Sequence, residues 1–212
     1  MRSNKPISLD FNLLPDLSSS SAWILLSDEL EASITKLPET YDRAESALHF
    51  CWSITGALDV YERTDPKSIK RREGYLRASL AEFVSMEETL ARDLVSIGTN
   101  STPIKINHSL NPLLHIIREL RNFEIHLHSA SLSSEIREVI FANTNSEIDI
   151  WMVGDLLEAD FRKLKNAKLY NNSDIPKMLD WFSQAQKGWG VHDLVYRSIV
   201  IYCEEIKRAY SL

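Results

Sequence analysis

The feature that most constrains the fold is the recurrence of apolar residues at spacings of three and four over long segments. The longest of these segments runs from about Pro66 to Ile97, and its apolar residues in helical register are Tyr75, Leu76, Leu80, Phe83, Met86, Leu90 and Leu94. Only 6 of the 212 residues are glycine, which argues against a turn-rich all-β protein. We therefore predict a mainly α-helical bundle.

Shorter segments with the same periodicity predict the remaining helices. They cover about residues 39–61, 111–127, 155–168, 176–187 and 191–210. Residues 136–141 and 147–153 are instead rich in β-branched and aromatic side chains, and a polar segment separates them. We therefore predict a β-hairpin insertion over about 136–153. Residues 1–37, which contain Pro6, Pro15 and a serine run, predict an irregular N-terminal arm with one short helix.

Composition and charge limit the partners and the compartment. The formal charge of −6 argues against a surface that is basic throughout, although a local basic patch remains compatible with it. No apolar run approaches the roughly 18 residues of a membrane span, so we expect no membrane association and a cytoplasmic protein. Cys51 and Cys203 form no metal-type pair and are expected to be buried thiols. We expect no cofactor and no metal.

The segment with the strongest candidates for catalytic side chains lies on the predicted helix over about 111–127. There Asn111-Pro112 predicts a helix cap and first turn, and the apolar residues Leu113, Ile116, Ile117, Leu120, Phe123 and Leu127 form a stripe. Arg121, Asn122 and His126 fall off this stripe. Arginine keeps its charge at any physiological pH and histidine titrates near neutrality, so together they offer the groups that phosphodiester cleavage requires.

The arrangement Arg121-Asn122-x-x-x-His126 resembles the Arg-x4-6-His motif of the HEPN superfamily in its common Arg-Asn-x-x-x-His form. The resemblance implies that residues 38–212 form a HEPN-like helical domain and that the protein is a metal-independent endoribonuclease of a defence, toxin or RNA-processing system. It further implies that His126 transfers the proton of the 2′-hydroxyl attack on single-stranded RNA, while Arg121 stabilises the charge on the phosphorane. The implied products are a 2′,3′-cyclic phosphate and a 5′-hydroxyl.

Helix geometry alone does not decide which histidine transfers the proton. Arg121 and His126 are separated by roughly 140° around one helix, whereas Arg121 and His128 are within about 20° of each other. His126 is preferred because it fits the Arg-Asn form of the motif, which places the Asn122 amide where it can orient the imidazole. The resemblance also implies a homodimer in which the motif helices of two subunits meet, so that an arginine of one subunit can act beside the histidine of the other.

Further basic residues are candidates for binding RNA. Arg118 shares the motif helix, and Lys70, Arg71 and Arg72 lie near the start of the long helix. His128 completes the set of RNA-binding candidates. The alternative to the enzyme is a non-catalytic helical protein that binds a nucleotide or another protein, and an antitoxin is one partner that a toxin would require.

Overall fold

The computed structural model describes residues 6–18, 25–55, 65–99, 101–126, 132–141, 144–154 and 156–212. The side chains of residues 124–126, 139–141, 144–146 and 148 are outside this description. The described residues form seven α-helices: α1 (Asp28–Ile34), α2 (Pro38–Thr55), α3 (Pro66–Ser96), α4 (Pro112–His126), α5 (Glu158–Phe161), α6 (Asp174–Trp189) and α7 (Val191–Tyr210). Two antiparallel strands, β1 (Leu132–Phe141) and β2 (Thr144–Val153), lie between α4 and α5. The prediction of a mainly helical bundle with a β-hairpin is confirmed.

Helices α2 and α3 form an antiparallel pair that is fixed at both ends by hydrogen bonds. Near the end of α3, the Asp93 carboxylate accepts hydrogen bonds from the backbone N–H of Thr40 at 2.8 Å and from its hydroxyl at 2.7 Å. Asp93 therefore caps the start of α2, whose first amides have no partner within the helix. At the opposite end, Arg72 of α3 donates to the carbonyl of Ile54 in α2.

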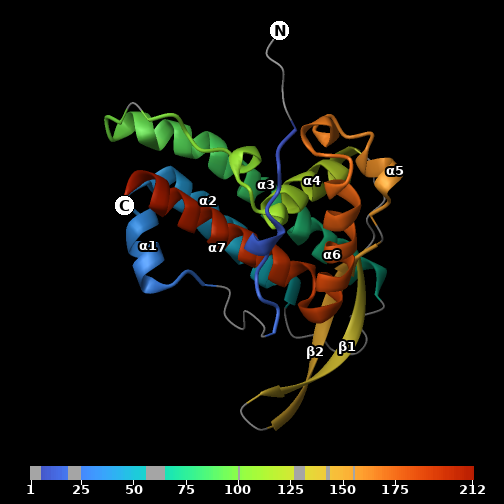
Figure 1. Ribbon diagram of the computed structural model, residues 1–212. Coiled ribbons are helices and arrows are strands. Elements are labelled where there is room, and N and C mark those ends of the chain that lie inside the picture. The colour runs from blue at the N-terminus through green and yellow to red at the C-terminus, as the bar shows by residue number, and fades with distance from the viewer. Residues whose placement is uncertain are drawn as a thin grey trace.

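Helix α7 is the central element of the bundle. It contacts α1, α2, α3, α4, α6 and β2, and Figure 1 shows it lying across α2 with its C-terminal end beside α1. Its buried side chains include Leu194, Ile199, Tyr202 and Ile206. Cys203 of α7 and Cys51 of α2 are both free and buried, as expected from the sequence. Burial raises the pKa of the Cys203 thiol to about 12, so both groups act as core side chains.

The hairpin projects from the bundle below α6 and is attached at its base (Figure 1). The strands pair from Leu132↔Val153 to Phe141↔Thr144, so both are longer than the sequence predicted. Trp151 is fully buried, and the Arg72 guanidinium lies 4.8 Å from its ring centroid. The Gln186 side chain of α6 bonds both the N–H and the carbonyl of Val153 at 3.0 Å. These contacts join the hairpin to α3 and α6.

The predicted helix over 155–168 is wrong in the part of the chain that the structure describes. Residues 158–161 form the short α5 and residues 167–169 form a 3₁₀ turn, η4. The backbone N–H groups of Leu164, Ala167 and Tyr170 each bond the carbonyl three residues earlier, at 3.0 to 3.2 Å. Buried residues in this segment also recur at intervals of three. This spacing fits successive tight turns rather than an α-helix of 3.6 residues per turn.

The described part of the N-terminal arm packs on the body. Leu9 is buried, the N–H of Ile7 bonds the carbonyl of Leu169 at 2.7 Å, and the N–H of Asp10 bonds that of Leu110 at 2.9 Å. Within the described part of the chain, none of the helices has the length and apolar character needed to cross a membrane.

Candidate functional site on helix α4

Helix α4 begins where the sequence predicted and is buried over most of its length. The Asn111 side chain accepts a hydrogen bond from the N–H of Leu113 at 2.9 Å, and Pro112 occupies the first turn. The described stripe residues from Leu113 to Phe123 are buried, whereas Leu127 lies outside the described residues. Two polar residues, His115 and Glu119, are also fully buried. The polar side of α4 is therefore narrow.

Arg121 and Asn122 lie on this narrow polar side, and both are partly exposed. The Arg121 Nη1 donates to the Asn122 Oδ1 at 3.4 Å, while the Asn122 Nδ2 donates to the Glu119 Oε2 at 2.9 Å. The Asn122 amide thus links the guanidinium to a buried carboxylate. The expected contact between Asn122 and the His126 imidazole stays a prediction, because the side chain of His126 lies outside the described residues.

The buried carboxylate of Glu119 is a part of this site that the sequence interpretation missed. Its Oε1 accepts hydrogen bonds from Asn166 Nδ2 at 2.9 Å and from the Tyr170 hydroxyl at 3.3 Å. The amides of Asn122 and Asn166 therefore both donate to a carboxylate that is removed from water, and the Tyr170 hydroxyl, which also contacts His115, divides its single hydrogen between two acceptors. Helical spacing contained a signal for it, because Glu119 is three residues after Ile116 and four before Phe123, which both belong to the apolar stripe.

His115 extends the same network into the core. Its Nε2 lies 2.8 Å from the carbonyl of Ser109 and its Nδ1 lies 3.2 Å from the Tyr170 hydroxyl. A carbonyl can only accept, so Nε2 carries the hydrogen, and the unprotonated Nδ1 competes with the Glu119 Oε1 for the single hydrogen of the Tyr170 hydroxyl. Burial lowers the pKa of His115 to about 4, so its imidazole is neutral at physiological pH.

The structure does not show which of the two histidines considered for proton transfer lies closer to Arg121. His126 is the last residue of α4, but its side chain is outside the description, and His128 lies outside the described residues altogether. The angular argument about Arg121 and the two histidines stays a prediction.

Arg118 faces α3 rather than open solvent. Its Nε lies 3.8 Å from the Glu87 Oε1, and its side chain is 18% exposed. The same Glu87 oxygen accepts a hydrogen bond from the N–H of Ile106 at 2.7 Å. Arg118 is therefore engaged in joining α4 to α3, which reduces its availability to a phosphate.

The structure separates the three basic residues near the start of α3. Lys70 and Arg71 are exposed, whereas Arg72 is buried between the end of α2 and Trp151. An arginine that is 5% exposed cannot present its guanidinium to RNA on the surface. The sequence interpretation grouped them because positions 70–72 are adjacent, but adjacent helical residues point in different directions.

No group of three or more His, Cys, Asp or Glu side chains with a metal-binding arrangement occurs among the residues that the structure describes. A cavity of about 770 Å³ lies between α1 and α2, and no residue of α4 lines it.

The fold and the α4 network define a mainly helical protein with a β-hairpin and a polar network built around a buried glutamate. Comparisons of the chain with protein-family models, curated proteins and solved structures found no match.

Proposed function

We propose that the protein is a metal-independent endoribonuclease in which Arg121 and His126 act on single-stranded RNA. The proposal rests on the motif Arg121-Asn122-x-x-x-His126 and on its resemblance to the HEPN superfamily. The 2′-oxygen of the ribose forms a bond to phosphorus, and the bond from phosphorus to the 5′-oxygen breaks. His126 accepts the proton of the 2′-hydroxyl, and the resulting imidazolium returns a proton to the departing 5′-oxygen, which leaves as a 5′-hydroxyl. Arg121 stabilises the charge on the phosphorane.

The observation that supports this proposal best is that Arg121 has no carboxylate partner among the side chains that the structure describes. The only hydrogen bond of its guanidinium to a described residue is the 3.4 Å contact with Asn122, and its Nε has no partner there. Arg118 and Arg197, by contrast, both contact carboxylates. A guanidinium without a carboxylate partner retains the capacity to bind a phosphate through two parallel hydrogen bonds.

We further propose that the enzyme is a homodimer whose α4 helices meet across a two-fold axis. The roughly 140° between Arg121 and His126 prevents one straight helix from directing both at one phosphate. In a dimer, Arg121 of one subunit can act with His126 of the other. Light scattering at tens of micromolar should then give the mass of two chains, and a monomer at that concentration would contradict the composite site.

Purified protein should cleave single-stranded RNA in the presence of a chelator and leave the corresponding DNA intact. Arg121→Ala should lower the cleavage rate by about a hundredfold or more, as expected for the loss of a group that stabilises transition-state charge. The matched control is Arg208→Ala, which removes an exposed arginine at the end of α7 and should leave cleavage unchanged.

The same assay decides between the two histidines. His126→Ala should abolish cleavage and His128→Ala should leave substantial activity; the reverse result would transfer the role to His128. Activity that survives both substitutions, or that needs a divalent ion, would reject the proposal.

A non-catalytic interaction or nucleotide-binding protein, with an antitoxin or another protein as partner, is the second candidate. The observation that favours it is the use of Asn122 within the subunit, where its amide links Arg121 to Glu119. In that case Arg121 binds a phosphate without cleaving it. Saturable binding of a mononucleotide that Arg121→Ala weakens, with RNA left intact, would support this function.

A further inference from the structure

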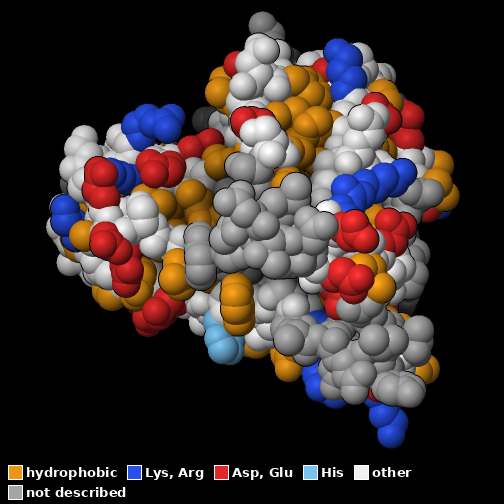
Figure 2. All heavy atoms as spheres, turned by 90° about the horizontal axis from the view of Figure 1, so that it is seen from below, with side chains coloured by type: hydrophobic (Ala, Val, Ile, Leu, Met, Phe, Trp, Pro, Cys, Tyr) orange, Lys and Arg blue, Asp and Glu red, His pale blue; other side chains and the backbone are white. Residues whose placement is uncertain are grey.

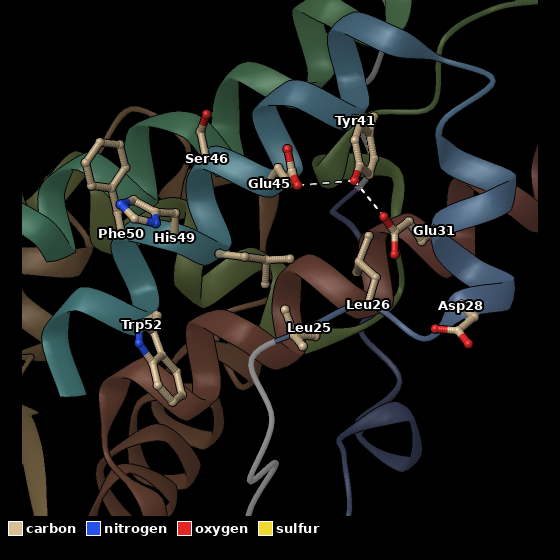
Figure 3. Close-up of a pocket in the computed structure, with 11 residues that line it drawn as sticks. Leu25, Leu26, Asp28, Glu31, Tyr41, Glu45, Ser46, His49, Phe50 and Trp52 are labelled. Atoms are coloured by element: carbon tan, nitrogen blue, oxygen red, sulfur yellow. Dashed lines mark hydrogen bonds between the residues drawn. The ribbon is translucent and has the colours of Figure 1, made fainter. Parts of the chain in front are cut away.

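A groove lies between α1 and α2, away from the α4 network, and it has two chemically different ends (Figure 3). Its volume is about 770 Å³. Aromatic side chains from α2 lie at one end, and carboxylates from α1 and α2 surround Tyr41 at the other (Figure 3). Leu25 and Leu26 lie between these ends. Figure 2 shows acidic side chains beside hydrophobic ones on the side of the molecule where α1 lies.

The aromatic end exposes unusually large apolar side chains. Trp52 is 54% exposed and Leu25 is 70% exposed, while Leu26 and Leu48 beneath them are buried. His49 and Phe50 complete this end. Exposed tryptophan and leucine beside a concave apolar surface are typical of protein–protein contacts, in which a few aromatic side chains provide most of the binding free energy.

The acidic end places two exposed carboxylates around one phenol. The Tyr41 hydroxyl lies 2.8 Å from the Glu31 Oε1 and 3.2 Å from the Glu45 Oε1. A phenol has one hydrogen, so it cannot satisfy both carboxylates at once. The hydrogen bond to Glu31 also raises the pKa of Tyr41, which keeps the phenol protonated.

Among the described residues, no lysine or arginine compensates the charge at this end of the groove. The charged residues that line it are Asp28, Glu31 and Glu45, and no lysine or arginine contributes to its lining. None of these three carboxylates forms an ion pair with a described residue, whereas the nearby Glu29 pairs with Lys207 at 2.6 Å. A ligand that brings a cation between Glu31 and Glu45 would replace water as their hydrogen-bond donor and reduce the repulsion between the carboxylates.

We propose that this groove binds an amphipathic basic helix of a protein partner. Apolar side chains of that helix pack against Trp52, Leu26 and Leu48. A lysine or arginine one turn away, on the same face, enters the acidic end and bonds Glu31 and Glu45. Nucleic acid and anionic lipid carry the wrong charge for this end. The proposal does not depend on ribonuclease activity.

The direct test uses a labelled 18-residue amphipathic helical peptide of leucine and lysine, titrated with the full-length protein by fluorescence anisotropy. The wild-type protein should bind it saturably, and added salt should weaken the complex because ionic contacts contribute. A peptide with glutamate at every lysine position should not bind. The double substitution Glu31→Gln and Glu45→Gln should raise the Kd by about tenfold or more, and Trp52→Ala should raise it by a similar factor.

Matched controls separate this groove from the rest of the surface. Glu88→Gln neutralises an exposed carboxylate of α3, and Val95→Ala shortens a side chain that is 76% exposed. Both should leave the Kd unchanged. Equal binding to the wild type and the double Gln variant, no binding to the wild type, or equal binding of the acidic peptide would each overturn the proposal. Self-association that Trp52→Ala abolishes, without peptide binding, would identify a second copy of the chain as the occupant and would also overturn it.

Discussion

At the scale of single residues, Glu119 is a buried carboxyl group whose hydrogen-bond partners among the described residues are neutral side chains. Asn122 of α4 and Asn166 of the turns after α5 donate to its carboxylate, and the Tyr170 hydroxyl contacts both this group and the His115 imidazole. Such a group stabilises the fold only while its donors stay in place, because an unsatisfied buried carboxylate is costly. The position of Asn122, and through it that of Arg121, therefore depends on the segment that contains Asn166 and Tyr170.

Leu120 and Arg121 are neighbours in the sequence with opposite environments, so their substitution should have unequal effects on stability. Leu120 is fully buried, and Leu120→Ala should lower the free energy of unfolding by about 2 to 5 kcal/mol through lost burial and a cavity. Arg121→Ala should lower it by less than about 1 kcal/mol, since Arg121 is partly exposed and makes one long hydrogen bond. Urea denaturation of both variants measures this difference. Equal losses would mean that Arg121 serves the fold.

The sequence allowed good prediction of apolar residues in this region and poor prediction of buried polar ones. The stripe from Leu113 to Phe123 follows from periodicity alone, because burial of apolar side chains needs no particular partner. Glu119 and Arg72 are buried only because distant residues meet them: Asn166 and Tyr170 for Glu119, and Ile54 and Trp151 for Arg72. Those partners are fixed by the tertiary fold, which the pattern of a single segment does not contain.

At the scale of elements, the junction between α6 and α7 depends on one glycine. Gly190 has φ of +88°, and an added Cβ would lie 2.8 Å from the His192 ring and 3.0 Å from the carbonyl oxygen of Trp151. Its conformation and its surroundings therefore both exclude a side chain. The junction brings α7 back across the bundle at a fixed angle.

Gly190→Ala should destabilise the protein by more than about 1 kcal/mol, from the backbone conformation alone, with the close contacts adding to the loss. Gly188→Ala is the matched control, because Gly188 is within α6 and a Cβ there would meet nothing within 4 Å. That variant should be unchanged or slightly more stable, since alanine favours a helix over glycine by about 1 kcal/mol. Thermal melting compares the two, and similar melting temperatures would contradict the steric argument.

The boundaries of helices were predictable where a local sequence signal marks the first or last turn. Asn111-Pro112 gave the start of α4, and the end of α6 lies close to the glycines that the sequence contains there. Residues 158–170 lacked such a signal. Their apolar residues fit both a helix and a series of tight turns over a short segment, and only packing against α6 and the N-terminal arm distinguishes these conformations.

At the scale of the whole molecule, the N-terminal arm joins segments that are distant in sequence. The Trp189 indole donates to the carbonyl of Leu17 at 2.9 Å, and the Tyr196 hydroxyl donates to the carbonyl of Leu25 at 2.9 Å. Leu17 thus contacts the end of α6, and Leu25 contacts α7. The composition of the arm predicted an irregular segment, but the residues it contacts could not be predicted, because single side chains of α6 and α7 determine its path.

The pH dependence of global stability should reflect His115 and His192, both buried with a pKa lowered to about 4 by burial. The folded protein holds them neutral, whereas in the unfolded chain each accepts a proton near pH 6.5. Stability is therefore complete above about pH 6.5 and falls as the pH decreases toward 4, by up to about 1.4 kcal/mol per pH unit for each histidine. Below pH 4 both states are protonated, so these groups cause no further loss.

Urea denaturation at a series of pH values tests this dependence. His115→Gln should make the decline between pH 6.5 and 4 shallower. His108→Gln, which replaces an exposed histidine of the 3₁₀ turn η3 (Ile106–His108), should leave the decline as it is in the wild type. Identical slopes for all three proteins would show that His115 is not held neutral by the fold.

The attachment of the hairpin also determines where its sheet could grow. A two-stranded ribbon has two free edges, and an unpaired edge can recruit a further strand. At the base, Gln186 occupies both backbone groups of Val153, and the Glu73 carboxylate accepts from the N–H of Leu132 at 3.4 Å. Helix side chains thus take the bonds that a third strand would need. Edge pairing between molecules is therefore confined to the outer part of the ribbon. The exposed side chains of Glu135, Arg137 and Glu138 are charged there, so a strand of another molecule would need complementary charges to pair with it.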